Sequence, residues 1–112
     1  MTILTEAIKR KPHWLYLINS GNNDDVFKVG YTSRDIESRL EEIKIDYTVP
    51  MATIQKRCRI YGEAAVLSLE KQLHKQCYEY WDSTYGGVEW FELDQQNLTQ
   101  ITQLYDSYNQ LH

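Results

Sequence analysis

The sequence predicts an α+β fold, in which a small, mostly antiparallel sheet is flanked by helices. Aromatic and aliphatic runs without a helical period occupy the first third of the chain and are separated by a turn-rich segment of hairpin length. Amphipathic segments then alternate with further short apolar runs, without an internal repeat or a low-complexity linker. The 112 residues, of which 42% are hydrophobic, are enough for one domain with one core.

The chain is expected to divide into an arm and a domain. Residues 1–12 are polar and basic and end in Pro12, which is typical of a loose N-terminal arm or of a short helix over 4–10. Residues 13–112 would form the domain, including a C-terminal packing helix. No run approaches the eighteen or so apolar residues of a membrane span, and no signal peptide is evident, so a soluble, intracellular protein is expected.

The domain is predicted to begin with a β-hairpin. Residues 13–19 and 26–31 are rich in aromatic and β-branched side chains, and residues 20–25, Ser-Gly-Asn-Asn-Asp-Asp, form the connection. The second strand places Val26 and the stem of Lys28 on one face, and Phe27, Val29 and Tyr31 on the other.

A helix over 35–44 should follow the hairpin, with Thr32 or Ser33 as its N-cap. Arg39 lies on the flank of its apolar stripe, near the hairpin on which the stripe packs. That stripe consists of Ile36, Leu40 and Ile43.

A third strand is predicted over 51–60 because Pro50 ends any helix and the side chains then alternate. One face would carry Ile54, Lys56, Cys58 and Ile60, and the other Gln55, Arg57 and Arg59. The cations of this strand, Lys56, Arg57 and Arg59, are expected to line one edge of the sheet.

The second half is predicted to contain two helices around a short strand. The first, over 63–80, has an apolar stripe of Val66, Leu69, Leu73 and Cys77, with Glu70 and His74 stacked beside it. Gly86 and Gly87 break the chain before a strand over 88–93. Asp94 then caps a helix whose buried side is supplied by Leu98, Ile101, Leu104 or Tyr105, Tyr108 and Leu111.

Charge and cysteine content restrict the function. The net charge of −4 argues against binding nucleic acid by bulk attraction, but residues 1–59 carry +2 and residues 60–112 carry −6. Any nucleic-acid surface should therefore lie mainly on the N-terminal half. Cys58 and Cys77 are expected to be reduced, half-buried packing residues, because they have no CxxC spacing and a chain with this much apolar content does not need a disulfide. Two isolated thiols and scattered histidines also do not make a zinc site.

Two groups of residues could carry chemistry. Tyr16 and Lys28, on adjacent strands, lie near Arg39, and a phenol, an ammonium and a guanidinium together suit phosphoryl transfer. A tyrosine in a hairpin is, however, more often part of the core. On the later helix, Glu70 could hold Mg²⁺ through its carboxylate, or could be a solvated residue paired with His74 or another helical neighbour.

The order and spacing of several short motifs resemble the GIY-YIG endonuclease superfamily, in particular its compact branch in phage and bacterial proteins. The resemblance covers roughly residues 13–93. The matching motifs are Trp14-Leu15-Tyr16, Lys28-Val29-Gly30-Tyr31-Thr32, Arg39, a helix with Glu70-x-x-x-His74, and Glu89-Trp90-Phe91-Glu92-Leu93.

The resemblance implies a divalent-metal-dependent nuclease that hydrolyses DNA with Mg²⁺ or Mn²⁺. Tyr16 would act as general base toward the attacking water or orient it, and Lys28, in the place of a motif tyrosine, would help to activate the nucleophile. Arg39 would steady the scissile phosphate and Glu70 would bind the metal. Gly30 would allow close packing of strand and helix, while Tyr31 and His74 would support the site or contact substrate, as Lys56, Arg57 and Arg59 could.

The first motif lacks its glycine, and the asparagine of many relatives has no clear counterpart; Asn97 is a match by position alone. An alternative therefore stays open, namely a catalytically idle nucleic-acid-binding or protein-interaction module of the same fold, for example a phage regulator of a host enzyme. The nuclease would act in the cytoplasm of a bacterial or phage-infected cell. Its DNA target could be branched or unspecific, and a homodimer or a protein partner could supply specificity.

Overall fold

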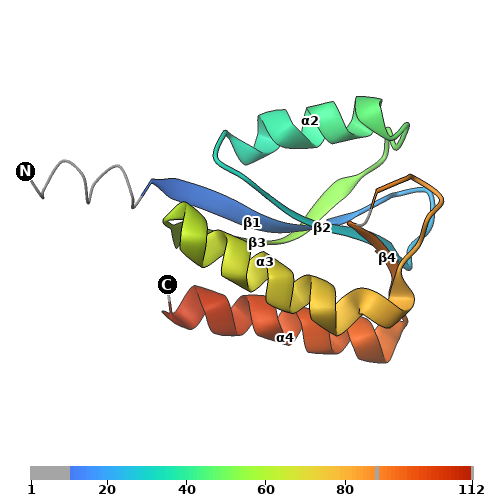
Figure 1. The fold of residues 1–112 in the computed structure, drawn as a ribbon. Helices are drawn as coiled ribbons and strands as arrows, with labels where there is room; N and C mark the ends of the chain where they lie inside the picture. The colour runs from blue at the N-terminus through green and yellow to red at the C-terminus, as the bar shows by residue number, and fades with distance from the viewer. Residues whose placement is uncertain (1–10, 88, 112) are drawn as a thin grey trace, which may run out of the picture.

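The computed structural model describes residues 11–87 and 89–111, with side chains as far as Asn109, and contains a four-stranded antiparallel sheet between helices (Figure 1). The predicted fold class is confirmed, and so is the order of elements. The arm or helix expected over residues 1–12 lies, as far as residue 10, outside the described residues. The elements are β1 (Pro12–Asn19), β2 (Val26–Thr32), α2 (Ile36–Asp46), β3 (Thr53–Tyr61), α3 (Glu63–Cys77), the 3-10 turn η1 (Tyr78–Tyr80), β4 (Trp90–Glu92) and α4 (Gln95–Leu111).

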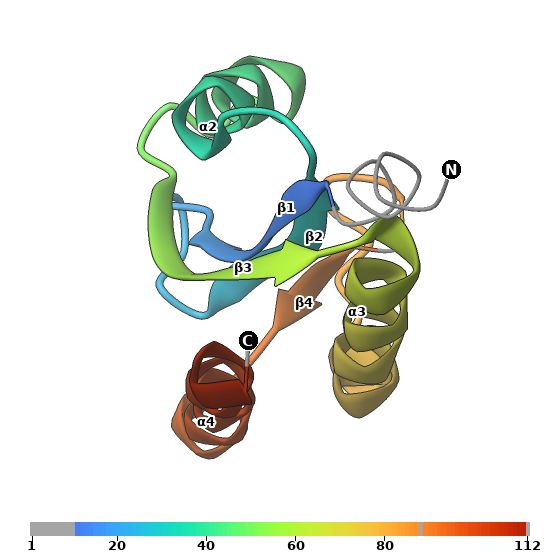
Figure 2. The ribbon, with the colours of Figure 1, turned by 90° about the vertical axis from the view of Figure 1, so that its left-hand side faces the viewer.

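Helices cover both faces of the sheet. Helix α2 lies over one face, whereas α3 and α4 lie over the other, as the two views in Figures 1 and 2 agree. The strand order is β3-β1-β2-β4, so the N-terminal hairpin forms the centre of the sheet. Because β1 is covered on both faces, its sequence is almost continuously apolar, unlike a strand with one wet face.

The pairing of β1 with β2 brings the predicted site residues of the hairpin close together. Tyr16 pairs with Gly30 and Ile18 pairs with Lys28. As predicted, alternate residues of β2 serve different cores: Val26 packs under α2, whereas Phe27 and Val29 pack under α3 and α4. Within the connecting loop, the side chain of Asn19 donates to the carbonyls of Asn23 at 3.3 Å and Asp24 at 3.0 Å, and accepts from the Gly21 amide at 2.9 Å.

Helix α2 has the predicted buried stripe but a different cap. Asp35 is the N-cap, and its carboxylate accepts from the backbone amide of Ser38 at 3.0 Å. The prediction of Thr32 or Ser33 was wrong, because Thr32 is still the last residue of β2 and its hydroxyl accepts from the amide of Arg34 at 3.1 Å. Ile36, Leu40 and Ile43 are buried against the sheet.

Strand β3 forms one edge of the sheet, and its faces differ from the prediction at one position. The pairing with β1 shifts between Leu17 and Ile18, so that Leu17 pairs with Lys56 but Ile18 pairs with Ile54. This irregularity takes Gln55 out of the pairing and moves Ile54 to the α2 face, opposite to the predicted grouping. Lys56 stays on the face of α3 and α4, so it does not share a face with Arg57.

The second half of the chain packs mainly on the face away from α2. Helix α3 ends at Cys77, earlier than expected, and the next residues form η1. Asp94 caps α4 as predicted, since its carboxylate accepts from the Asn97 amide at 2.8 Å. Cys58 and Cys77 are free thiols, as expected, but both are fully buried in this core rather than half-buried, because α3 and α4 cover them. Among the described residues, no helix combines the length and apolar character needed to cross a membrane.

Candidate functional site

The phenol of Tyr16 lies across Gly30 at the centre of the sheet. A Cβ at position 30 would lie 2.6 Å from the Tyr16 hydroxyl oxygen and 2.9 Å from its Cζ. The close approach permitted by this glycine is therefore to the Tyr16 ring, and not to a helix as the resemblance implied. Tyr16 is 1% exposed, and its backbone carbonyl accepts a 2.6 Å hydrogen bond from the hydroxyl of Tyr105 on α4.

Lys28 lies beside Tyr16 on the same face and is fully buried. Its Nζ donates to the Tyr16 hydroxyl at 3.4 Å, forms an ion pair with Glu89, and lies 5.8 Å from the centre of the Tyr47 ring. Burial alone would lower the pKa of Lys28, but Tyr16, Glu89 and Tyr47 outweigh it, so the pKa is raised. Lys28 is thus an ammonium at neutral pH.

Arg39 of α2 completes the group on this face. Its guanidinium is half-buried and donates to the Glu42 carboxylate at 3.1 Å. Burial would lower the pKa of Arg39, but nearby Tyr16 and Glu42 raise it. Glu42 also accepts two hydrogen bonds from Arg34, at 2.6 and 2.7 Å. The hydrogen bonds from Arg34, and then that from Arg39, lower the pKa of Glu42 to about 2. The predicted position of Arg39, on the flank of α2 facing the hairpin, is confirmed.

Glu70 approaches from α3, on the other side of the sheet. Only 9% of its surface is exposed, and its Oε2 has no hydrogen-bond partner among the described residues. Burial raises the pKa of Glu70, with a further contribution from Glu89, while His74 and Lys28 act in the opposite direction. The reading of Glu70 as a solvated surface residue is therefore wrong. Lys28 and Glu89 act on Glu70 through their charge, and no hydrogen bond or ion pair joins them to Glu70 in the described part of the chain.

Glu89 is a candidate site residue that the sequence reasoning missed. It directly precedes β4, and its backbone carbonyl accepts from the Val29 amide at 3.0 Å, which extends the pairing with β2. This places the Glu89 carboxylate against Lys28. The sequence shows an acidic residue before Trp90 and Phe91 but does not show that β4 pairs with β2, so its only signal was its place in a motif.

Two of the supporting residues also lie near β2. The Nε2 of His74 lies 2.9 Å from the Val29 carbonyl, and its ring packs 5.5 Å from that of Phe91, so His74 attaches α3 to the sheet. Tyr31 is half-buried on the same face. Burial raises the pKa of Tyr31, and three acidic neighbours, Glu63, Glu70 and Glu89, add to the effect.

The three cationic side chains of β3 lie on two different faces of the sheet. Arg57 pairs with Tyr16 and Arg59 pairs with Trp14, so both lie on the face of the proposed site. The amine of Lys56 instead binds Asp106 of α4 at 2.8 Å, on the opposite face. The three cations line one edge of the sheet as predicted, since β3 is an edge strand, and Lys56 lies on the opposite face from the two arginines because consecutive residues of a strand point to opposite faces.

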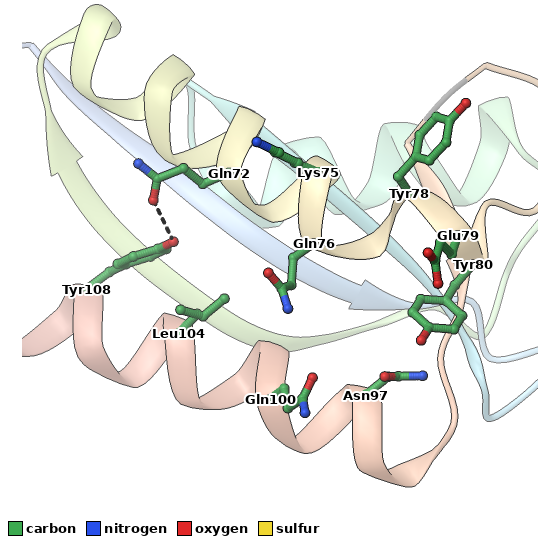
Figure 3. A pocket seen from close by; sticks show the side chains of 10 residues that line it. All are labelled: Gln72, Lys75, Gln76, Tyr78, Glu79, Tyr80, Asn97, Gln100, Leu104 and Tyr108. Carbon is green, nitrogen blue, oxygen red and sulfur yellow. Dashed lines mark hydrogen bonds between the residues drawn. The ribbon is translucent and has the colours of Figure 1, made fainter.

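A groove of about 660 Å³ lies between α3 and α4, and Figure 3 shows the side chains that line it. It is on the face of the sheet opposite to α2 and the group around Tyr16. Asn97 is on this groove, so the one asparagine matched by position does not join the proposed site. None of Tyr16, Lys28, Arg39 and Glu70 contributes to the groove. Its lining is formed by Gln72, Lys75, Gln76, Tyr78, Glu79, Tyr80, Asn97, Gln100, Leu104 and Tyr108.

The donor atoms near Glu70 suit a hard cation. The described residues contain no group of three or more His, Cys, Asp or Glu side chains arranged to hold a metal. A buried carboxylate oxygen without a partner, near a second carboxylate, is nevertheless the type of donor that Mg²⁺ prefers. Mg²⁺ commonly takes one or two protein carboxylates and completes its coordination with water and substrate phosphate. Glu70 therefore fits such an ion.

A family model for the T5orf172 domain matches residues 13–106. The chain belongs to the T5orf172 domain family. T5orf172 domains are small, phage-associated and related to nuclease-like folds. Searches among curated proteins and among solved structures give no significant match. In this T5orf172 domain, the matched range includes Tyr16, Lys28, Arg39 and Glu70, together with Glu89.

Proposed function

We propose that this T5orf172 domain is a divalent-metal-dependent endonuclease that hydrolyses phosphodiester bonds in DNA. The observation that supports the proposal is the juxtaposition of the Tyr16 phenol, the Lys28 ammonium and the Arg39 guanidinium, together with a buried Glu70 carboxylate oxygen that has no partner among the described residues and that feels the charge of Lys28. These are the groups that phosphoryl transfer needs, namely a proton relay, positive charge for the phosphate oxygens and an anionic ligand for a cation.

Each residue has a role that follows from its surroundings. Tyr16 orients the attacking water and relays its proton, while the ammonium of Lys28 donates to the phenolic oxygen and directs it. Arg39 forks onto the non-bridging phosphate oxygens, since its guanidinium is only partly exposed and already aligned by Glu42. Water oxygen bonds to phosphorus, the bond from phosphorus to the leaving oxygen breaks, and that oxygen takes up a proton.

Glu70 would hold Mg²⁺ or Mn²⁺, which when bound supplies a Lewis acid for the phosphate oxygens. His74 supports Glu70 by fixing α3 to the Val29 carbonyl. Glu89 keeps Lys28 charged and in place. We place the enzyme in the cytoplasm of a bacterial or phage-infected cell, where a homodimer or a protein partner could supply specificity.

The test is nicking of supercoiled plasmid in Mg²⁺, in Mn²⁺ and in EDTA. Wild type should nick with either metal and not in EDTA. Glu70→Gln should lose about 100-fold or more in rate, the order of effect that removal of one charge-stabilising group has in other enzymes. Glu79→Gln, which removes an exposed carboxylate from η1, is the matched control and should keep the wild-type rate. Equal rates for Glu70→Gln and wild type would reject the proposal.

The alternative is a binding or protein-interaction module of the same fold without turnover, which the net charge of −4 and the acidic second half of the chain favour. DNA binding with a steep salt dependence but no cleavage in either metal would support this alternative. Metal-dependent nicking that is lost in Glu70→Gln would exclude it.

A further inference from the structure

A cation-aromatic patch adjoins the proposed site on the α2 face of the sheet. It consists of Trp14 on β1 and of Arg57, Arg59 and Tyr61 on the edge strand β3. The pairing of β1 with β3 sets Arg59 opposite Trp14, and Arg57 opposite Tyr16. Side chains two apart on a strand share a face and are about 6.6 Å apart along it, so the patch leads from Tyr61 toward Tyr16.

The members of the patch lie within cation-π distance of one another. The guanidinium carbons of Arg57 and Arg59 lie 5.4 and 5.6 Å from the centre of the Trp14 ring. Arg59 also lies 5.7 Å from the centre of the Tyr61 ring, so aromatic rings flank its guanidinium. A cation-π contact favours this position of a guanidinium and leaves its N–H groups free to donate. The arginines are therefore arranged before any ligand arrives.

The patch is accessible. Arg57 and Tyr61 are each half exposed, and Arg59 is exposed as well. The guanidinium of Arg57 forms an ion pair with the carboxylate of Glu37 on α2, with a nitrogen–oxygen distance of 3.2 Å. Arg59 forms no ion pair within the described part of the chain. In a protein with a net charge of −4, an exposed guanidinium that has no carboxylate partner among the described residues is suited to bind an anion.

We infer that this patch binds a single-stranded segment of the nucleic acid on which the proposed active site acts. The inference rests on the proposed function and narrows its substrate to DNA with an unpaired strand. Single strands bind where cationic groups follow the backbone and aromatic rings stack on bases. In a duplex the bases already stack on each other, so Tyr61 and the guanidinium faces would gain only contacts to the backbone.

The experiment measures binding in EDTA, where the proposed cleavage cannot occur. Fluorescence anisotropy compares a labelled single strand of about 12 nucleotides with a blunt duplex of the same sequence, over a series of salt concentrations. Wild type should prefer the single strand. Arg59→Gln and Tyr61→Leu should each weaken single-strand binding about tenfold, in the range expected for one stacked base.

The salt series separates the two contributions. Arg59→Gln should reduce the slope of log affinity against log salt by about 0.7, the value for one phosphate contact to a single strand, and Tyr61→Leu should leave the slope unchanged. Tyr61→Phe keeps the ring and should retain wild-type affinity. Lys75→Gln removes one positive charge from the exposed surface of α3 and should change neither affinity nor slope. Circular dichroism checks that each variant is folded.

Equal binding of duplex and single strand by wild type would overturn the inference, and so would wild-type affinity in both Arg59→Gln and Tyr61→Leu. Failure of the proposed function gives a different result. Single-strand preference without nicking in Mg²⁺ or Mn²⁺ rejects the nuclease and leaves the binding surface intact. Nicking without single-strand preference rejects the binding surface alone.

Discussion

Replacing Gly30 with alanine is expected to destabilise the domain and to disturb the proposed site together. The added Cβ would lie 2.6, 2.9 and 3.0 Å from the Oη, Cζ and Cε1 atoms of Tyr16, all closer than ordinary carbon contacts. The phenol cannot move aside freely, because Tyr16 is 1% exposed and its ring is packed in the α2-side core. Either the ring shifts away from Lys28 or the hairpin distorts.

The size of the effect follows from two opposing contributions. Inserting a methyl group into a well-packed core costs about 1–3 kcal/mol. Replacing glycine by alanine also restricts the unfolded chain, which stabilises by about 0.4–1 kcal/mol. The net loss should be about 1–2 kcal/mol, or roughly 4–10 °C in Tm for a domain of this size. Displacement of the phenol by about 1 Å should slow nicking by about 100-fold.

Urea unfolding followed by tryptophan fluorescence measures the stability, and plasmid nicking measures the activity. The double variant Gly30→Ala with Tyr16→Phe is the control, because it removes the closest contact, that to Oη. The two changes should therefore couple, with a double variant at least about 0.5 kcal/mol more stable than their sum predicts. A Gly30→Ala variant with the wild-type urea midpoint would refute the packing argument.

Three further predictions follow from buried polar groups. Mg²⁺ at ten times its dissociation constant should raise the free energy of unfolding of wild type by about 1.4 kcal/mol in thermal unfolding. The increase for Glu70→Gln should be much smaller, and an equal increase in both proteins would show that Glu70 does not bind the metal. Tyr105→Phe loses the 2.6 Å hydrogen bond to the Tyr16 carbonyl and should lower the free energy of unfolding by about 1–2 kcal/mol in urea. An unchanged free energy of unfolding would argue against that hydrogen bond. Burial raises the pKa of Cys58 to about 11 and of Cys77 to about 12, so iodoacetamide at pH 8 should label both only after unfolding; fast labelling of native protein would contradict their burial.

Local patterns were sufficient for the hairpin and for α2. Residues close together in the sequence determine the turn-rich loop before Val26 and the alternation of β2, and the apolar stripe of α2 follows from residue spacing alone. These elements could therefore be predicted without knowledge of tertiary contacts. The N-cap was misplaced because several residues near Asp35 have the right chemistry, and the choice depends on where β2 ends. Likewise, the face of Ile54 depends on an irregular pairing with Leu17 and Ile18 that its own sequence does not reveal.

The candidate site was predictable in part. Tyr16 and Lys28 were correctly placed on adjacent strands near Arg39, whereas Glu70 lies on α3, across the sheet from them. The burial of Tyr16 and Lys28 depends on Tyr47 and Trp90, which pack over them from distant segments. The burial of Glu70 and the contact between Glu89 and Lys28 depend on tertiary packing, which no periodicity encodes. Glu70 was predicted as a metal ligand only from the resemblance to a known family. That its Oε2 atom is buried without a partner among the described residues depends on tertiary packing and could not be predicted from the sequence.

The most direct test of the proposed metal site is a crystal of the protein soaked with Mn²⁺ and examined by anomalous diffraction. The nuclease proposal predicts a peak at bonding distance from Glu70, about 2.0–2.2 Å, on the side that faces Tyr16 and Arg39. A soaked crystal of Glu70→Gln should lack this peak. No peak at Glu70 in wild type, or peaks confined to surface carboxylates, would contradict the central claim that Glu70 binds the catalytic metal.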